Sequence, residues 1–297
     1  MTAEDVNLIL PYLNSNNSAD TFGALVGLLK YGGENGISMS REKLEKLASH
    51  SSVQNRVLAA QAIKKFGSSG YDDIVEKLLD DEETSVRREA LLAVGKIKNG
   101  NLWPMVLDAL THPHTRDAAA KALEAGGESA LAFIESGLAN KDFPKAARIK
   151  LAKVCGNIRG EAVTKLLAAY ISVPENDLRE AVLSALSECS FSGANVNGEI
   201  QAQVKNEAAD VRVLFSALRE IESKDEMSLA AQAIRIELKH ARERLFYLLS
   251  FIHDRKAILN ARRIINQRNE AKLPYAIETL DTILPRDIKL IMVPLAE

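Results

Sequence analysis

The sequence Val86-Arg87-Arg88-Glu89-Ala90-Leu91-Leu92-Ala93-Val94-Gly95-Lys96-Ile97 decides the fold. Its apolar residues recur three and four positions apart, which is the spacing of one helical face. An arginine begins a similar phrase at six places, 29 to 33 residues apart: Arg56, Arg87, Arg116, Arg148, Arg179 and Arg212. Self-similarity at a period of about 20–50 residues is typical of stacked repeat proteins. The sequence therefore predicts a solenoid.

The positions that follow each arginine have a common register. The third, sixth and seventh residues after the arginine are small or apolar, for example Ala90, Ala93 and Val94 after Arg87. These positions share one helical face, and small residues there let neighbouring helices approach closely. We predict that this face forms the core.

A second apolar helix precedes each phrase, as at Ile74–Leu79 and Trp103–Leu110. Turns rich in Asp, Ser, Asn and Pro separate the two helices, and glycines break the chain between units. No alternating pattern is long enough for a strand. The sequence predicts an all-α, right-handed α-solenoid of helix pairs with five or six clear units.

Both ends depart from this pattern. We expect atypical capping helices over residues 1–40, with a glycine-rich break at 31–36, because a terminal repeat has one face in water. Repeats are expected over 41–225, and Asp210-Val211-Arg212 is interpreted as the start of a further second helix. Residues 226–297 are predicted to form a basic C-terminal helical segment that packs on the last repeat as a cap.

The recurring arginines, which we call the arginine ladder, have two interpretations. Each side chain can reach carboxylates or carbonyls of a neighbouring turn, with Asp81, Asp142, Asp177 and Asp210 as candidate partners. The alternative is a row of arginines that binds a ligand. We expect the ladder to be structural.

A stripe of side chains one, five and nine positions after each arginine is predicted to face outward on the second helices. A concave surface of mixed charge suits a protein or peptide partner better than a phosphate backbone. An ordinary solvated face is the alternative. The candidate binding residues of this stripe are Gln61, Lys65, Arg88, Leu92, Lys96, Lys121, Lys153, Asn157, Glu180 and Glu188.

Charge is unevenly distributed. The whole chain has a net charge of −2, but residues 235–272 hold ten Lys or Arg and four acids. Such a segment can meet an anionic membrane surface, an acidic partner or nucleic acid. The alternative is a solvated face with internal ion pairs such as Glu237–Arg235 and Glu243–Lys239. Aromatic residues make up only 5% of the chain, so nucleic acid is the least expected of the three partners. The basic patch comprises Lys239, Arg242, Arg255, Lys256, Arg262 and Arg263.

No catalytic or metal-binding motif stands out. His112-Pro113-His114 has no third ligand at a suitable spacing, and Cys155 and Cys189 fall in the core register as free thiols, which points to a reducing compartment. There is no glycine-rich phosphate loop. We therefore expect no metal, no cofactor and no enzymatic activity. The chain has no signal-peptide layout and no apolar run long enough to cross a bilayer, so a cytoplasmic location is expected.

Two resemblances add to this interpretation. The phrase at residues 86–97 resembles the second helix of a HEAT repeat of the PBS-lyase-like subtype, over about residues 40–222. Such repeats occur in scaffolds, transport adaptors, phycobilin lyases and alkylpurine DNA glycosylases. Residues 241–249 and 276–284 resemble the HEAT-containing soluble region of bacterial proteins with an ATP/ADP-antiporter-like domain. That resemblance implies a fragment tethered to the inner membrane, and the apolar end at 291–297 fits either a cut or a docked tail.

Together these observations predict a non-catalytic protein-interaction or regulatory module, implied by resemblance to be the cytoplasmic part of a nucleotide-transporter-like membrane protein. Its expected partners are a protein or peptide on the concave face, with an anionic membrane surface or the rest of a membrane protein as alternatives. The competing hypothesis is a HEAT-fold enzyme similar to an alkylpurine DNA glycosylase or a phycobilin lyase.

Overall fold

The computed structural model describes residues 3–222, 228–267 and 271–296. Within these ranges the chain forms α-helices, short 3₁₀ helices and turns, and no strand. The all-α repeat fold predicted from the sequence is confirmed. The chain divides into two compact units, residues 1–154 (unit 1) and 155–297 (unit 2), and each is described by itself.

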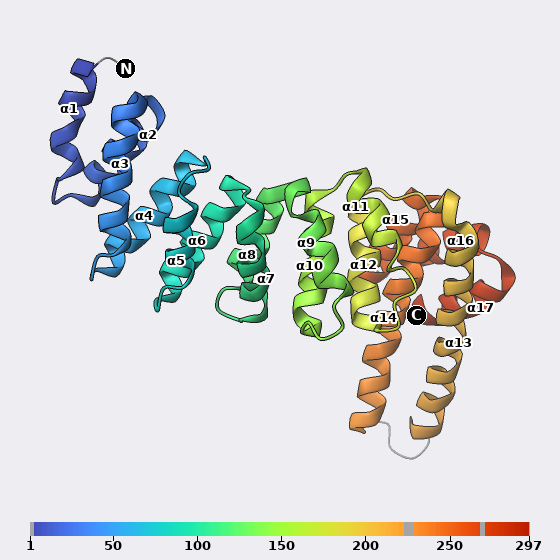
Figure 1. Cartoon of the computed structure of the whole chain (residues 1–297). Helices are drawn as coiled ribbons and strands as arrows, with labels where there is room; N and C mark the ends of the chain where they lie inside the picture. Colours follow the sequence, from blue (N-terminus) through green and yellow to red (C-terminus); the bar gives the residue numbers. More distant parts are fainter. Residues whose placement is uncertain (1–2, 223–227, 268–270, 297) are drawn as a thin grey trace. The chain divides into compact units, whose positions relative to one another are not determined.

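Unit 1 is a succession of helix pairs (Figure 1). After α1 (Ala3–Leu13) and α2 (Ser18–Tyr31), a first and a second helix alternate along the chain. They are α3 (Gly33–Ala48), α4 (Val53–Phe66), α5 (Asp72–Leu79), α6 (Thr84–Ile97), η1 (Gly100–Leu102), α7 (Trp103–Thr111), α8 (Arg116–Gly126), η2 (Gly127–Ala130), α9 (Leu131–Ala139) and α10 (Lys145–Ile158), within which the division between the units falls.

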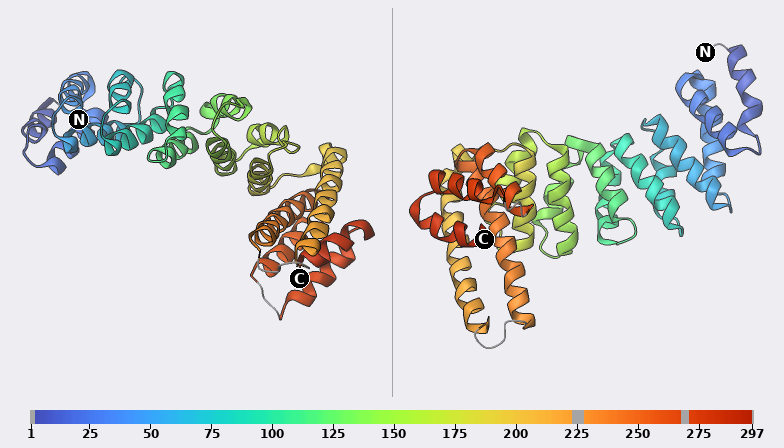
Figure 2. Two further views of the ribbon diagram at one scale, coloured as in Figure 1. Left: turned by 90° about the horizontal axis from the view of Figure 1, so that it is seen from below. Right: turned by 180° about the vertical axis from the view of Figure 1, so that it is seen from behind.

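The second helices of unit 1 pack on one another in the predicted register. Helix α6 contacts both α4 and α8, and the views in Figure 2 show these helices side by side. The side chains of Ala90, Ala93 and Val94 are fully buried. A Cβ atom at Gly95 would lie 2.6 Å from the carbonyl oxygen of Ala122, so the α6 and α8 backbones approach closely there. The predicted core face is confirmed.

The glycine-rich break near the N-terminus is shorter than predicted. Helix α2 ends at Tyr31 and α3 begins at Gly33, so a single residue separates them. Two glycines permit this sharp turn. Gly33 has a φ of +62°, and a Cβ at Gly32 would lie 2.6 Å from the carbonyl oxygen of Leu28.

Unit 2 has a different layout after its first two helices. Its elements are α11 (Glu161–Ala168), α12 (Asn176–Glu188), η3 (Gly193–Val196), α13 (Asn197–Glu222), α14 (Leu229–Ile252), α15 (Arg255–Asn266), α16 (Leu273–Ile283) and α17 (Arg286–Ala296). Helices α13 and α14 lie side by side. The C-terminal half of α13 and the N-terminal half of α14 extend beyond the other helices of unit 2 (Figure 1). Helix α14 also contacts α12, α15 and α17.

The predicted helix start at Asp210-Val211-Arg212 is wrong. These residues lie inside α13, which is continuous from Asn197 to Glu222. Between those ends the sequence has no proline, and its only glycine is Gly198 at the start. Nothing in the local chemistry therefore ends the helix before Arg212.

Both cysteines are free, as predicted. Cys155 is fully buried and Cys189 is half-buried. Burial raises the pKa of the Cys155 thiol to about 12. Burial also raises the pKa of Cys189. Neither environment favours the reactive thiolate.

Candidate functional site: a groove in unit 2

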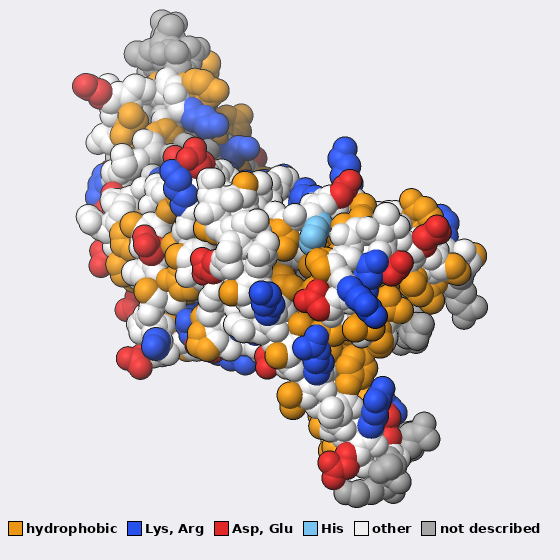
Figure 3. All heavy atoms as spheres, turned by 90° about the vertical axis from the view of Figure 1, so that its right-hand side faces the viewer, with side chains coloured by type: hydrophobic (Ala, Val, Ile, Leu, Met, Phe, Trp, Pro, Cys, Tyr) orange, Lys and Arg blue, Asp and Glu red, His pale blue; other side chains and the backbone are white. Residues whose placement is uncertain are grey.

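Unit 2 has a groove of about 1000 Å³ beside α14. We call it the groove. Its apolar lining comes from α13, α14 and the last three helices: Phe215, Leu238, Ile265, Leu273, Pro294 and Leu295. Its charged and polar lining comes mainly from α14, with Glu180 on α12 and Asn266 on α15: Glu180, Arg235, Lys239, His240, Arg242, Glu243 and Asn266. Figure 3 shows cationic side chains next to exposed apolar ones on unit 2.

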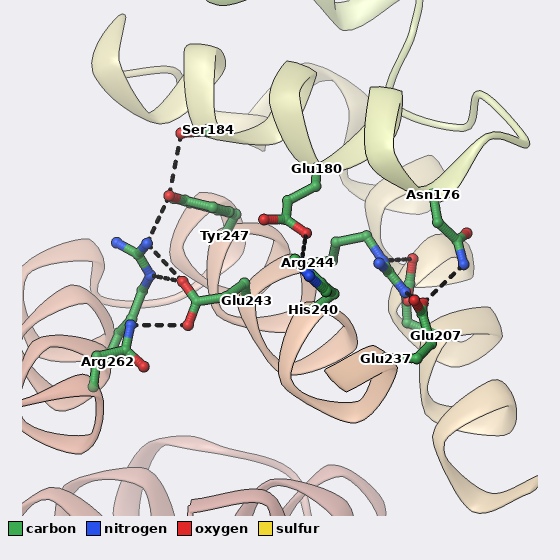
Figure 4. Close-up of polar contacts among 11 residues, drawn as sticks. Asn176, Glu180, Ser184, Glu207, Glu237, His240, Glu243, Arg244, Tyr247 and Arg262 are labelled. Carbon is green, nitrogen blue, oxygen red and sulfur yellow. Dashed lines mark hydrogen bonds and ion pairs between the residues drawn. The ribbon is translucent and has the colours of Figure 1, made fainter. Parts of the chain in front are cut away.

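Beside the groove, a buried ionic cluster joins α12, α13 and α14 (Figure 4). Glu207 on α13 is fully buried, and its carboxylate accepts hydrogen bonds from Arg179 at 2.8 Å and from Arg244 at 3.0 Å. Arg244 also donates to Glu237 at 2.9 Å, and the same Glu237 oxygen accepts a hydrogen bond from Asn176. Because two arginines surround one buried carboxylate, removing that carboxylate would leave uncompensated buried charge.

A second polar chain connects α12, α14 and α15. The guanidinium of Arg262 lies 4.4 Å from the centroid of the Tyr247 ring and donates to the Tyr247 hydroxyl at 2.7 Å. It also donates to Glu243 at 2.7 Å, and Asn266 donates to the other Glu243 oxygen. Since the tyrosine oxygen accepts from Arg262, its own proton is available to Ser184, 3.2 Å away. These contacts fix the wall of the groove.

One titratable pair lies at the edge of the groove. His240 Nδ1 is 2.8 Å from the Oε2 atom of Glu180, so α14 and α12 are joined by this hydrogen bond (Figure 4). Both side chains are partly exposed. A carboxylate on one ring nitrogen orients an imidazole, which is an arrangement used in acid–base catalysis.

The arginine ladder contacts its own turns in five of its six members. Arg87, Arg116, Arg148 and Arg179 each donate to a carbonyl of the preceding turn. Arg56 does the same and also binds Asp81 through two hydrogen bonds of 2.6 and 3.0 Å.

The sixth member, Arg212, differs from the others. It is exposed in the middle of α13, so its place in the ladder is corrected. The predicted partners Asp142, Asp177 and Asp210 are exposed, whereas Asp81 is largely buried.

The predicted stripe is distributed over both units. In unit 1 its residues are exposed or half-exposed, and Arg88 donates to the carbonyl of His114 in the next repeat. In unit 2, Asn157 and Glu188 are exposed, but Glu180 faces α14 through His240. Helix α14 therefore lies against α12 where the stripe was expected to meet a partner.

Three of the six residues of the basic patch are engaged in contacts within unit 2. Arg262 is bound to Glu243, and Arg255 donates to the backbone of Ser187. Arg242 donates to the carbonyl of Leu295 at 2.9 Å. Lys239, Lys256 and Arg263 are exposed. The two acids expected to pair with Arg235 and Lys239 have other partners. Glu237 forms an ion pair with Arg244, and Glu243 forms one with Arg262.

The sequence analysis missed Glu207, Arg244 and Tyr247. One signal was available for Glu207, since it lies on the buried face of α13 that Val204, Ala208 and Val211 also form. A carboxylate on an apolar face needs a buried cation. The identity of that cation is set by a contact 37 residues away, which helical periodicity does not reveal.

Comparison with known proteins agrees with the fold. Residues 41–125 match the family described as HEAT repeats. No curated protein sequence matches the chain. The resemblance of the C-terminal segment to transporter-associated proteins has no support in these comparisons. In the part of the chain that the structure describes, no helix is long and apolar enough to cross a membrane.

Several solved structures are similar at low identity. The complex of CpcE and CpcF of phycocyanin lyase from Nostoc sp. PCC7120 is 18% identical with a TM-score of 0.38, covering 77% of this chain and 91% of that one. Human deoxyhypusine hydroxylase is 14% identical with a TM-score of 0.34, covering 98% and 94%. An engineered protein is 19% identical with a TM-score of 0.24, covering 85% and 98%.

These structures require one correction. The phycocyanin lyase and the deoxyhypusine hydroxylase are enzymes by name. The prediction that this chain has no enzymatic activity is therefore corrected: a HEAT-like fold without a recognisable catalytic motif does not exclude catalysis.

Proposed function

We propose that the protein binds a peptide segment of a protein partner in the groove of unit 2. The observation that carries this proposal is an open apolar lining bordered by charged side chains from α12 and α14. An apolar centre with a polar rim is the usual anatomy of a protein–protein interface. Helices that surround such a groove commonly accept a segment of a partner between them.

The apolar lining offers anchors for such a segment. Phe215 and Leu273 are half-exposed and Pro294 is exposed, so a bound side chain would remove further apolar surface from water. Burial of apolar surface contributes about 25 cal/mol per Å². Leu238 and Leu295 also line the groove with only 6% and 8% exposure, so they are already packed within unit 2.

The apolar lining argues against a nucleic acid in this groove. Affinity for nucleic acid depends mainly on contacts with phosphates. Phe215, Leu273 and Pro294 offer no such contacts and suit the apolar side chains of a peptide.

The exposed stripe of unit 1 is proposed as a second contact surface for the same class of partner. Lys65, Lys96 and Lys121 are exposed on successive second helices. Repeat proteins commonly bind through such rows of equivalent positions. Association with a transporter-like membrane protein remains a prediction from the sequence.

The test is a selection of random peptides displayed on phage against the whole protein. Binding of the selected peptides is then compared with the variant Phe215→Ser/Leu273→Ser. The matched control is Leu290→Ser, which removes a leucine with 70% exposure that does not line the groove. Thermal melts verify that all three proteins are folded.

We expect the selected peptides to bind the wild type and the control alike, and the double variant at least about tenfold more weakly. Peptides that bind the double variant as tightly as the wild type would place the binding site elsewhere. Failure to select any groove-dependent peptide would overturn the proposal.

A second candidate is an enzyme that acts on a small molecule in the same groove. The hydrogen bond between His240 and Glu180 favours it, because it holds an imidazole at the edge of a hollow of the size that binds small molecules. An open-chain tetrapyrrole, the chromophore class of the phycobilin lyases named in the sequence resemblance, is a suitable probe. Binding would change its absorption spectrum, and His240→Gln would alter any turnover without abolishing binding.

A further inference from the structure

We infer that the partner segment is an amphipathic helix with carboxylates along one edge. This inference rests on the proposed function and names the ligand class of the same groove. Three cations of α14 line the groove, namely Arg235, Lys239 and Arg242. They are four and three residues apart, so they follow one another along one side of α14 over about 10 Å.

The cations of this row are available to a ligand to different degrees. Lys239 is exposed, and among the described residues no hydrogen bond or ion pair involves it. Arg242 donates to the carbonyl of Leu295 and to the side-chain oxygen of Asn266 and is thereby held in place. Arg235 forms an exposed ion pair with Glu222 at 2.6 Å. Lys239 is therefore the centre of the row and its most accessible charge.

The acids of the groove are already bound to groups of unit 2. Glu243 accepts hydrogen bonds from Arg262 and Asn266. Glu180 is hydrogen-bonded to His240. These contacts partly compensate both carboxylates, whereas Lys239 keeps its charge facing the solvent. The site is therefore complementary to a ligand that carries carboxylates opposite α14.

The groove also has an apolar lining beside the cation row. Ile265, Leu273 and Leu295 come from α15, α16 and α17, and the hydrogen bond from Arg242 to the carbonyl of Leu295 joins the row to this lining. A ligand that meets both needs apolar side chains on one face and Asp or Glu along the adjoining edge. A helix supplies this with residues three and four positions apart, which is the spacing of the cations on α14.

The experiment uses the best groove-dependent peptide from the selection and measures its affinity by fluorescence anisotropy. The peptide is compared with a copy in which every Asp and Glu is replaced by Asn or Gln, and with a copy that carries a central proline. The protein is compared with Lys239→Glu and with the matched control Lys256→Glu, an exposed lysine of unit 2 that does not line the groove. All measurements are made at about 50 and about 300 mM salt.

We expect the neutral peptide and the proline peptide each to bind at least about tenfold more weakly than the parent peptide. Lys239→Glu should weaken the parent peptide about fivefold or more and Lys256→Glu less than about twofold, with higher salt reducing the difference.

Two results would overturn the inference while leaving the proposed function intact. One is groove-dependent peptides that lack acids or bind equally well when neutralised. The other is full binding by the proline copy, which would indicate an extended ligand. Equal binding of the selected peptides to the wild type and to Phe215→Ser/Leu273→Ser is the separate result that would overturn the proposed function itself.

Discussion

At the scale of single residues, the arginine ladder closes the turns of the helix pairs. Arg56 binds two carbonyls of its own turn and both carboxylate oxygens of Asp81 in the next repeat. Arg87 then donates to the backbone carbonyl of Asp81. One aspartate thus joins two consecutive arginines, and a bidentate contact fixes its orientation.

Asp81→Asn should weaken this junction in a pH-dependent way. Burial alone would raise the pKa of the Asp81 carboxyl, but hydrogen bonds from Arg56 and from the Glu83 backbone outweigh burial, and its pKa lies below the ordinary value. Its stabilising effect is therefore present above about pH 4 and is lost as the pH falls through the lowered pKa. We expect the variant to melt about 2–5 °C below the wild type at pH 7.

The check is a series of thermal melts between about pH 7 and pH 2, in which the two curves should converge as the carboxyl is protonated. Asp142→Asn, which changes an exposed aspartate of a comparable turn, is the control and should match the wild type at every pH. A constant difference across the series would show that charge at Asp81 is not responsible.

Glu207→Gln should be among the most destabilising single substitutions in unit 2. The change keeps the shape of the side chain but leaves Arg179 and Arg244, both nearly buried, without their shared countercharge. Breaking a buried ion pair costs about 3–5 kcal/mol in the free energy of unfolding. Urea unfolding at neutral pH measures it. Asp210→Asn, an exposed acid of the same helix, should change the free energy by less than about 0.5 kcal/mol.

At the scale of the helices, the sequence predicted elements well where a repeat supplied the register. The helical phrase predicted at residues 86–97 is observed within α6, Thr84–Ile97, because its apolar residues recur at helical spacing. Where the repeat fails, so does the prediction. Arg212 keeps the spacing of the ladder but lies inside α13, because the spacing of one residue type carries no information about where turns occur.

The close approach of α6 and α8 predicts opposite effects for two glycine-to-alanine substitutions. Gly95→Ala would place a Cβ atom 2.6 Å from the Ala122 carbonyl oxygen and 2.8 Å from its Cα atom. Both are backbone atoms, so the two helices would have to move apart. We expect the free energy of unfolding to fall by about 1–2 kcal/mol, even though alanine favours a helix over glycine by about 1 kcal/mol.

The control is Gly23→Ala in the middle of α2, where a Cβ atom would meet nothing within 4 Å. It should stabilise the protein by about 0.5–1 kcal/mol. Thermal melts of the two variants should therefore move in opposite directions. If both variants are stabilised, the packing of α6 against α8 is looser than described.

At the scale of the whole molecule, the groove is the feature that sequence reasoning could not reach. Its lining extends from Glu180 to Leu295, on helices that follow no common repeat. Periodicity identifies the apolar face of each helix, but it does not say which faces meet. The stripe prediction placed Glu180 on an open surface for the same reason, since nothing in its own helix indicates that α14 covers it.

The repeat architecture predicts how far along the chain a core substitution lowers local stability. In a repeat protein each unit contacts mainly its neighbours, so stability is a sum of local terms. Ala93 is fully buried between second helices, and Ala93→Asp would put an unpaired charge there. We expect faster amide hydrogen exchange in α4, α6 and α8, with exchange in α13 and α14 close to the wild type. Lys121→Glu, on the exposed side of α8, should change neither region. Equal acceleration in both units would mean that the chain unfolds as a single cooperative body, and an unchanged α6 would mean that the core register is wrong.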